Sequence, residues 1–357
     1  MQHLFFSQKI IDWYNSHKRD LPWRNINNPY FIWLSEVILQ QTRVVQGMPY
    51  YFKFIETFPT VQDLAAADEK DVLRLWQGLG YYSRARNLHT TAKIVVKNYG
   101  GEFPNTYQEL LKLKGIGTYT AAAIASFAFG EKVAVLDGNV YRVLSRVFGE
   151  STDIASNGAK RVFTKIAETV LPDKDSDTHN QAIMEFGAIQ CTPGMPNCMF
   201  CPLSMECVAN ATGRVGMLPM KSKKIKVRER FFNYFVIEQN RNFAMHERTQ
   251  KDVWLGMYDF YLKEFSESTD SLDDIIEGDD FLNNLLKNSV IKRKSIVYVH
   301  ILTHQKIQTK FWHIEINPDF VLNLPLNFRW YSLNEVDDLP KSTLVNNYLT
   351  SFIFATT

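Results

Sequence analysis

All four cysteines of this 357-residue chain lie in one short segment, CTPGMPNCMFCPLSMEC, with the spacing C-x6-C-x2-C-x5-C. Four thiolates this close in sequence can hold zinc or an iron–sulfur cluster, because both accept four sulfur ligands. Structural zinc more often uses two C-x2-C pairs, whereas this segment has one pair with a longer arm on each side. The spacing therefore predicts a metal-binding loop over residues 191–207. It favours a cluster over zinc as the group held by Cys191, Cys198, Cys201 and Cys207.

The composition is that of an ordinary globular protein, with 45% hydrophobic and 22% charged residues. The length is enough for two or three domains, and no apolar run approaches the length of a membrane span. The N-terminus lacks the residue order of a signal peptide, so we expect an intracellular protein whose thiols stay reduced. The net charge of +2 provides no basic field. A nucleic-acid partner would therefore be held by local patches and backbone amides.

The chain changes character near residue 210. Apolar residues recur three and four apart in the first part, which predicts an all-helical domain over residues 1–210. A polar, basic stretch follows, and we interpret residues 211–229 as a linker. Short β-branched and aromatic runs such as SIVYVHILTH and QTKFWHIEI then predict an α+β domain over residues 230–357.

The segment LLKLKGIGTYTAAAIASFAFG places Gly115 and Gly117 between two helical patterns. This arrangement is typical of a helix–hairpin–helix at about residues 110–130, whose backbone N–H groups and helix N-terminus can bind a phosphate. A lone G-x-G is more often a simple turn between helices. Asp137 stands before the next helical pattern, where it can cap the helix, face a reacting sugar as an anion, or do both.

A glutamate lies in an apolar helical pattern nearer the N-terminus. Glu36 is surrounded in WLSEVIL by large apolar residues, and burial would raise its pKa toward that of a useful general acid. The alternative is an exposed glutamate on the polar side of the helix beside Gln40.

Together these features resemble a known group of proteins. The cysteine spacing, the hairpin and Asp137 are similar to those of the endonuclease III superfamily of helix–hairpin–helix DNA glycosylases. Within it, PWR, SEVILQQT, GLGYYSRARNL, LDGNV and NQAIMEFGA closely resemble the adenine DNA glycosylase (MutY) family over residues 5–210. The resemblance implies an all-α N-terminal catalytic region with a [4Fe–4S] cluster loop and a C-terminal α+β Nudix-like domain.

The resemblance also implies a function in base excision repair. The family removes adenine mispaired with 8-oxoguanine or guanine, after the base is flipped out of duplex DNA. Glu36 would protonate adenine and Asp137 would stabilise the sugar cation or trap it, while Asn139 and Tyr119 would hold these groups in place. Members that also cut the backbone carry a lysine where this chain has Tyr119. Tyrosine cannot form an imine, so we expect a monofunctional enzyme without β-lyase activity.

Further residues acquire roles only through the resemblance. It places Arg19, Trp23, Arg24 and Gln181 in the adenine pocket, although Gln181 has the alternative of an ordinary polar helix position. It also implies that Gln41, Thr42 and Tyr81 contact the opposite base or wedge between bases. The plain alternative for Tyr81-Tyr82 is packing at a helix end, and we expect one of the two to do this.

The C-terminal part departs from the family in one motif. The segment HILTH aligns with the family's F-S-H loop, which monitors oxidised guanine, but Leu302 replaces the aromatic residue and Thr303 the serine. We expect weakened discrimination between the two guanines, while His304 either reads the lesion or packs in a strand. The R-E-x-x-E-E signature of Nudix hydrolases is absent, so we expect recognition without pyrophosphatase activity.

The partner implied is double-stranded DNA containing these mispairs. We expect a cytoplasmic monomer, associated with the nucleoid if the source is bacterial, and no membrane partner. Two rivals are an endonuclease III that acts on oxidised pyrimidines and a catalytically silent DNA-binding protein. Tyr119 and the second domain oppose the first rival, and the presence of both Glu36 and Asp137 opposes the second.

Overall fold

The computed structural model describes residues 2–222 and 226–354, which form two compact units. The first unit comprises residues 1–66 and 87–223, and the second comprises residues 67–86 and 224–357. The helical N-terminal region and the C-terminal region of strands and helices are confirmed. Residues 223–225 of the predicted linker lie outside the described residues. Among the described residues, we find no helix with the length and apolar character needed to cross a bilayer.

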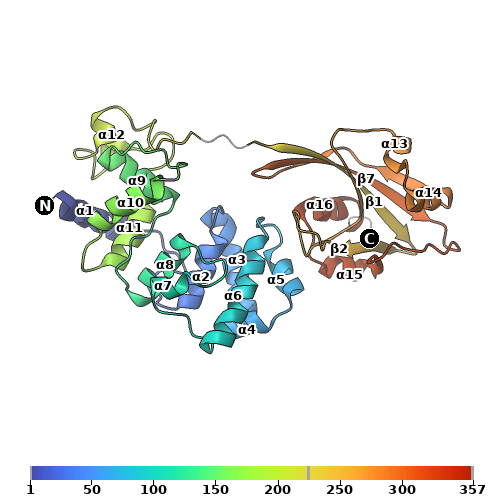
Figure 1. Ribbon diagram of the computed structural model, residues 1–357, viewed down its shortest axis with the longest axis horizontal. Coiled ribbons are helices and arrows are strands. Elements are labelled where there is room, and N and C mark those ends of the chain that lie inside the picture. Colours follow the sequence, from blue (N-terminus) through green and yellow to red (C-terminus); the bar gives the residue numbers. More distant parts are fainter. Residues whose placement is uncertain (1, 223–225, 355–357) are drawn as a thin grey trace. The chain divides into compact units, whose positions relative to one another are not determined.

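The first unit is built from helices and short connections (Figure 1). Helix α6 begins in the second unit and continues into the first. The elements are α1 (Gln2–His17), α2 (Pro29–Ile38), α3 (Val44–Thr57), α4 (Val61–Ala66), α6 (Ser83–Tyr99), α7 (Tyr107–Leu110), α8 (Thr118–Phe129), α9 (Gly138–Phe148), α10 (Ala159–Val170), α11 (Ser176–Ile189), the 3-10 turn η1 (Cys198–Phe200) and α12 (Val208–Ala211).

The turn between α7 and α8 is the predicted helix–hairpin–helix. Gly115 has φ of +79°, and a Cβ there would lie 2.7 Å from Cβ of Asn87, so only glycine fits the turn. Gly117 precedes α8 with an ordinary φ of −86°, and a Cβ there would meet no atom within 4 Å. Packing therefore does not require glycine at 117. The open space leaves its backbone accessible to a ligand.

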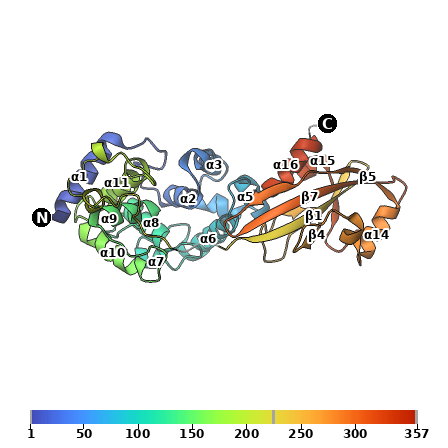
Figure 2. The ribbon, with the colours of Figure 1, turned by 90° about the horizontal axis from the view of Figure 1, so that it is seen from above.

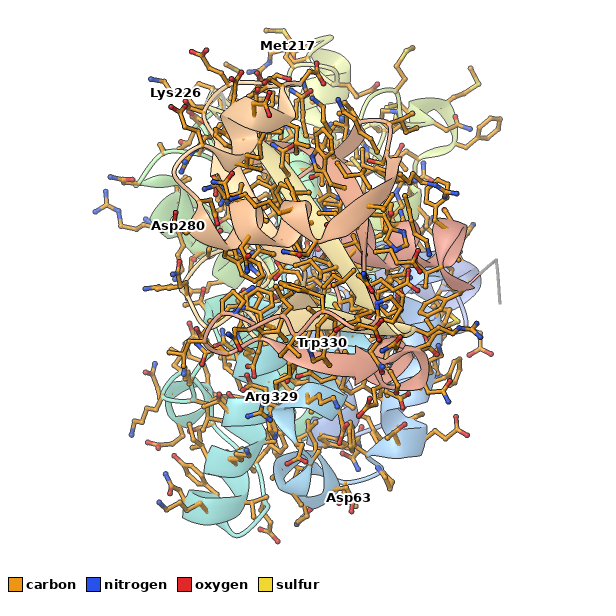
Figure 3. All side chains as sticks on the ribbon, turned by 90° about the vertical axis from the view of Figure 1, so that its right-hand side faces the viewer. Asp63, Met217, Lys226, Asp280, Arg329 and Trp330 are labelled. Carbon is orange, nitrogen blue, oxygen red and sulfur yellow. The ribbon has the colours of Figure 1, made fainter. Side chains whose placement is uncertain are left out.

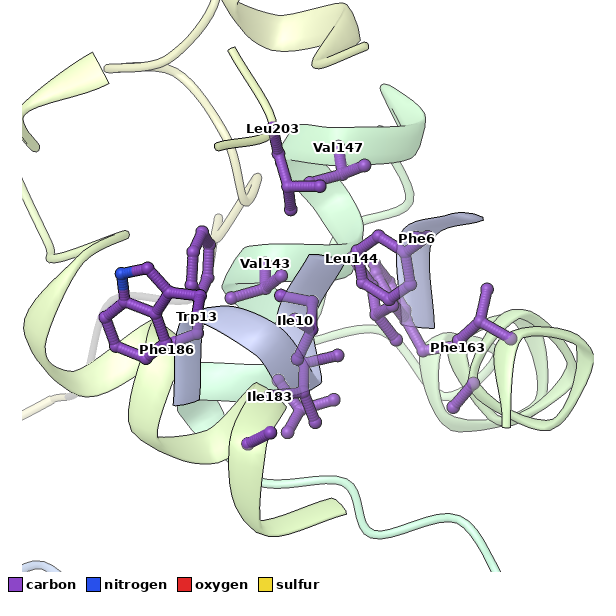
Figure 4. Close-up of a cluster of buried hydrophobic side chains, with 14 of the residues drawn as sticks. Phe6, Ile10, Trp13, Val143, Leu144, Val147, Phe163, Ile183, Phe186 and Leu203 are labelled. Atoms are coloured by element: carbon purple, nitrogen blue, oxygen red, sulfur yellow. The ribbon is translucent and has the colours of Figure 1, made fainter. Parts of the chain in front are cut away.

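A large apolar core joins α1, α9, α10 and α11 and reaches the cysteine segment (Figure 4). Burying side chains of this size contributes about 1.5–3 kcal/mol each relative to exposure, so this core fixes the relative positions of the four helices. The labelled members of the cluster are Phe6, Ile10, Trp13, Val143, Leu144, Val147, Phe163, Ile183, Phe186 and Leu203.

The second unit contains a mixed sheet with the strand order β3-β2-β1-β7-β5, in which β1 and β7 are parallel. Strand β4 pairs with β1, β6 with β7 and β8 with β2, all antiparallel. The strands are β1 (Arg228–Gln239), β2 (Asn242–Glu247), β3 (Tyr258–Asp259), β4 (Tyr261–Phe265), β5 (Ser289–Lys294), β6 (Tyr298–Ile301), β7 (Gln305–Ile316) and β8 (Arg329–Ser332).

Helices cover both faces of this sheet (Figure 2). On one face, α14 (Asp280–Lys287) buries Leu282 and Leu285 in a cluster that includes Ile275 of α13 (Leu272–Ile276). Trp330 of β8, labelled in Figure 3, packs on the same cluster. On the other face, α16 (Thr343–Phe352) stacks Tyr348 on Phe311 with ring centroids 4.2 Å apart. Helix α15 (Leu333–Asp338) follows β8 directly.

Residues 67–86 belong to this second unit, although they lie far upstream in the sequence. They form α5 (Glu69–Trp76) and the start of α6. Arg86 donates to the carbonyl of Leu255 at 2.7 Å, and the Lys341 amide donates to Oε1 of Gln77 at 3.0 Å. The segment that carries Tyr81 is thus attached to the sheet-containing unit.

Candidate active site and cysteine loop

Glu36 lies on α2, a helix whose start is defined by its sequence. Asn28 caps it by accepting from the amides of Tyr30 and Phe31, and Pro29 occupies the first turn. Glu36 is 8% exposed, so it does not occupy the exposed position that was its alternative. Burial raises its pKa to about 7, against the opposing effects of a hydrogen bond from Tyr119 and the charge of Arg24. The hydroxyl of Tyr119 donates to Oε2 of Glu36 in a short hydrogen bond.

Asp137 is the N-cap of α9, and its side chain is partly buried. Its Oδ1 accepts from the Val140 amide at 2.7 Å, and its Oδ2 accepts from Nδ2 of Asn139 at 2.7 Å. Burial raises the pKa of Asp137, and these two hydrogen bonds oppose that rise. The charge of Asp137 also raises the pKa of Glu36, which shows that the two carboxyls interact. Capping and a site role are therefore compatible in this geometry.

A buried arginine links Asn139 to the cysteine loop. Arg142 donates to Oδ1 of Asn139 at 2.8 Å, to the carbonyl of Gly187 at 2.6 Å and to the carbonyl of Cys191 at 2.7 Å. A Cβ on Gly187 would lie 2.6 Å from Cβ of Asn139, so α11 approaches α9 closely here. Sequence reasoning missed Arg142, and its position inside the LDGNVYR motif is the only signal that could have suggested it.

Three of the four predicted adenine-pocket residues line one cavity with Glu36: Trp23 and Arg24 from the segment before α2, and Gln181 from α11. Arg19 does not line it. Met184 and Phe127 supply apolar wall. The lining residues are Trp23, Arg24, Ile26, Ile32, Ser35, Glu36, Phe127, Gln181 and Met184.

A second buried glutamate organises the cationic side of this cavity. Glu185 accepts from Arg19 through both oxygens, at 2.6 and 2.9 Å, and from Arg24 at 3.4 Å. Arg24 also donates to Oε1 of Gln181 at 2.9 Å. Burial would raise the pKa of Glu185, but the Arg19 hydrogen bonds and the Arg24 charge hold it below its ordinary value. Sequence reasoning did not single out Glu185, although it lies in the apolar run IMEFGAI.

The predicted lesion-contacting residues lie in different places. Gln41 follows α2 with a left-handed φ of +55°, and Thr42 is next to it. Tyr81 also has a positive φ, of +49°, and is 45% exposed, whereas Tyr82 is buried. Left-handed backbone costs a non-glycine residue roughly 1–2 kcal/mol, and such strain is often retained at functional positions. Because Tyr82 is buried and Tyr81 is exposed, Tyr82 is the tyrosine that packs at the helix end.

Within the second unit, Tyr81 meets the turn between β6 and β7. Its hydroxyl forms a short hydrogen bond with Oγ1 of Thr303. The turn is closed by the Leu302 amide, which donates to the carbonyl of Gln305 at 2.8 Å. Thr303 and His304 are exposed at its tip. His304 thus does not pack inside a strand.

The four cysteines line one apolar cavity between the end of α11 and α12. Arg146 donates to Sγ of Cys191 at 3.3 Å and to the carbonyl of Thr192 at 2.8 Å. Burial, together with the charges of the neighbouring cysteines, raises the pKa of the Cys201 thiol to about 11. Four thiolates here would therefore need a bound cationic group to offset their repulsion.

The arrangement of the sulfurs bears on which group would fit. Among the described residues, no three Cys, His, Asp or Glu side chains are placed to hold one metal ion. The four cysteine side chains nevertheless surround a single cavity. Four thiol side chains around one cavity fit a group that takes four sulfur ligands, such as an iron–sulfur cluster.

Comparison with known proteins places both parts of the chain. Residues 34–170 match the family described as HhH-GPD superfamily base excision DNA repair protein, and residues 233–351 match the NUDIX domain family. The adenine DNA glycosylase of Buchnera aphidicola subsp. Baizongia pistaciae is 34% identical, over 98% of this chain and 97% of its own. The human adenine DNA glycosylase is 43% identical over 57% of this chain and 39% of its own.

A solved structure agrees with the fold of the first unit. A thermostable thymine-DNA glycosylase aligns with a TM-score of 0.55 and 31% identity, over 59% of this chain and 97% of its own. The predicted fold class, a helix–hairpin–helix glycosylase region followed by a Nudix-like domain, is therefore confirmed.

Proposed function

This chain belongs to the adenine DNA glycosylase family, as its motifs predicted, and we propose that it is a monofunctional glycosylase acting on adenine opposite 8-oxoguanine or guanine in duplex DNA. The observation that carries the proposal is the buried Glu36, which accepts a hydrogen bond from Tyr119 and interacts with Asp137. Glu36 supplies a proton donor and Asp137 an anion, while Tyr119 has a phenol where a backbone-cutting enzyme would need an amine.

Glu36 is the general acid in this proposal. Adenine leaves poorly as an anion, so the reaction needs a proton on the base as the bond to C1′ breaks. A carboxyl with a pKa of about 7 is protonated in a large fraction of molecules near neutral pH. It is also acidic enough to transfer that proton, which is the balance that general acid catalysis requires. Glu36 lines the cavity directly, so a base bound there can receive the proton at N7.

Asp137 acts on the sugar. As the glycosidic bond breaks, positive charge develops at C1′ and the ring oxygen, and a carboxylate held beside them stabilises that charge or traps it covalently. The Asn139 side chain and the Val140 amide both donate to Asp137, so they favour its ionised form and fix its orientation. Water then attacks C1′, with Glu36, now deprotonated, as the general base.

The absence of an amine supports hydrolysis without strand cleavage. Tyr119 stands at the sequence position where backbone-cutting members of the superfamily carry a lysine. Its hydroxyl donates to Glu36. No lysine is among the residues that line the cavity in the described part of the chain. Without an amine, no Schiff base forms at C1′, and β-elimination of the 3′-phosphate has no covalent intermediate from which to start.

A flipped adenine would have to open this cavity, because its volume of about 20 Å³ is little more than a water molecule needs. Gln181 and Arg24 hydrogen-bond to each other at 2.9 Å and can exchange that contact for the ring nitrogens and exocyclic amine of the base. Trp23 and Phe127 provide apolar wall, and Glu185 keeps both arginines in place. Extraction of the base from the duplex costs a few kcal/mol of stacking and pairing, and such contacts offset this cost.

The proposed DNA contacts are given for each unit by itself. In the first unit they are Gln41 and Thr42, which follow α2, and in the second unit Tyr81, Thr303 and His304 are proposed to contact 8-oxoguanine. An exposed tyrosine in a left-handed conformation is suited to wedge between bases. Gly115 and Gly117 would bind the DNA backbone through their amides, without reading sequence. The protein is proposed to act as a monomer.

Cys191, Cys198, Cys201 and Cys207 would hold the [4Fe–4S] cluster. When bound, the cluster supplies four iron–thiolate bonds that close the loop after α11. The guanidinium of Arg146 would offset part of the negative charge of the ligands. Arg142, which donates to the Cys191 carbonyl and to Asn139, makes the position of Asn139 depend on this loop.

Product analysis on defined duplexes tests the proposal. Single-turnover reactions would use adenine opposite 8-oxoguanine, adenine opposite thymine, and thymine glycol opposite adenine, each analysed with and without alkali. We expect breaks only with adenine opposite 8-oxoguanine, and only after alkali. Breaks at thymine glycol without alkali would show that the branch and the hydrolytic mechanism are both wrong.

A further inference from the structure

The second unit contains a cavity unrelated to the adenine pocket, at the hairpin end of its sheet. It has a volume of about 410 Å³, within the ~300–1,000 Å³ typical of small-molecule sites. Strands β1, β2, β5 and β7 and helices α15 and α16 all contribute to it. The lining residues are Glu238, Arg241, Phe243, Lys292, Arg293, His313, Leu333, Phe352 and Ile353.

The charges around the cavity do not balance. Lys292 bonds to Glu315 at 2.9 Å and lies 3.4 Å from Glu238, and Glu238 also bonds to His313 at 2.8 Å. Lys292 is thereby shared between Glu238 and Glu315. Arg241 and Arg293 have no carboxylate partner among the described residues, and the Arg293 guanidinium lies 4.3 Å from the Phe352 ring centroid. Two guanidinium groups are therefore left to bind an anion.

Arg241 is held in a conformation that arginine disfavours. Asn240 and Arg241 connect the paired residues Gln239 and Asn242, and their φ values are +50° and +60°. Such two-residue hairpin turns favour Asn-Gly, because both central residues need positive φ. The chain has Asn at the first position but arginine at the second, at a cost of about 1–2 kcal/mol relative to glycine. Strain retained beside a cavity suggests that the side chain has a use.

The remaining wall is apolar and partly aromatic. Phe243 is buried at the floor, and Phe352 lies beneath Arg293. Leu333 and Ile353 complete the wall, and the Glu238 carboxylate has lone pairs beyond those used by His313 and Lys292. A ligand that satisfies all these groups has a phosphate for the two arginines and a flat ring with N–H donors for the interior.

We propose that this cavity binds a nucleotide, with its phosphate on Arg241 and Arg293 and its base against Phe243 and Phe352. The nucleotide is either free or the 5′-phosphorylated end of a DNA strand, since both present the same chemistry. The site lies in the second unit and is formed without Glu36, Asp137 or the cavity around them. It does not depend on the function proposed above.

The hairpin offers a test that spares the fold. In Arg241→Gly the turn acquires its preferred residue, so thermal stability should be equal to or above that of the wild type, while the phosphate contact is lost. The matched control is Asn240→Gly, which alters the same turn and keeps Arg241. Calorimetric titration of the full chain would use dTMP, thymidine, inorganic phosphate and a 5′-phosphorylated oligonucleotide.

We expect dTMP to bind wild type and Asn240→Gly alike and to bind Arg241→Gly roughly ten- to hundredfold more weakly, the usual range for a lost charge-assisted hydrogen bond. Thymidine and inorganic phosphate should each bind more weakly than dTMP. If the oligonucleotide binds more tightly than dTMP and this extra affinity disappears in Arg241→Gly, the ligand is a strand end. If the oligonucleotide binds no more tightly than dTMP, the ligand is a free nucleotide. Equal dTMP affinity in wild type and Arg241→Gly, or equal affinity for dTMP and phosphate, would overturn the proposal.

Discussion

Two buried glutamates, Glu36 in the wall of the pocket and Glu185 behind its residue Arg24, differ in a way that sets their chemistry. Glu36 and Glu185 are 8% and 1% exposed. Glu185 is paired with Arg19 and Arg24, and its pKa is lowered. Glu36 receives only a phenol hydrogen bond and a more distant cationic effect, and burial raises its pKa to about 7. The same residue type, similarly buried, becomes a fixed anion where cations adjoin it and a proton donor where they do not.

The largest effect is expected from removing the proton donor. Glu36→Gln keeps the shape of the side chain and its acceptor for Tyr119, but it cannot release a proton. We expect the single-turnover rate of adenine excision to fall about 10²–10⁴-fold, the range for loss of a general acid. Affinity for the mispaired duplex, measured by fluorescence anisotropy, should change little. An excision rate within threefold of wild type would remove Glu36 from the mechanism.

The second effect separates the two roles of Asp137. Asn caps helices about as well as Asp, so Asp137→Asn should leave the stability of α9 nearly unchanged. The anion that faces the sugar is lost, and we expect about 10²–10³-fold slower excision. Rate and urea denaturation would be measured on the same preparation. A large loss of stability with a proportionate loss of rate would mean that Asp137 serves mainly as a cap.

The third change acts on the other glutamate. Glu185→Gln removes the charge that pairs with Arg19 and Arg24, and we expect a loss of about 1–3 kcal/mol in unfolding free energy at pH 7. Because the pKa of Glu185 is depressed in the folded state, its contribution is present above the unfolded pKa and is lost as pH falls through the folded pKa. The difference between variant and wild type in urea titrations should therefore shrink below about pH 4. A difference that grows on acidification would contradict the assignment.

The smallest effect tunes Glu36 without removing it. The Tyr119 hydroxyl donates to Glu36 and so favours its ionised form. Tyr119→Phe removes that donor, and the pKa of Glu36 should rise further. The alkaline limb of the excision rate would then move to higher pH, with a modest change in the maximal rate. A shift toward lower pH would mean that Tyr119 stabilises the protonated acid.

Much of this site could be predicted from local sequence. Glu36 in an apolar helical run, Asp137 before a helix, and the clustered cysteines each carry a signal within a few residues, because burial pattern and capping are local properties. The turn at Gly115 was also predictable from its two glycines between helical patterns, although its approach to Asn87 is not a local property.

The rest depends on partners distant in the chain. Glu185 acquires its charge state from Arg19 and Arg24, and Arg142 reaches Asn139 and the Cys191 carbonyl across two helices. No periodicity reports such pairings. The attachment of residues 67–86 to the sheet-containing unit likewise follows from contacts such as Arg86 with Leu255, which composition does not reveal.

The contrast between the two glutamates is tested most directly by the pH dependence of single-turnover excision of adenine opposite 8-oxoguanine. A protonated Glu36 is required, so the rate of the wild-type enzyme should decline as pH rises through about 7. Glu36→Gln should lack this decline at its much lower rate. A wild-type rate that stays level from pH 6 to about pH 9, or a decline that persists in Glu36→Gln, would contradict the assignment of Glu36 as the acid.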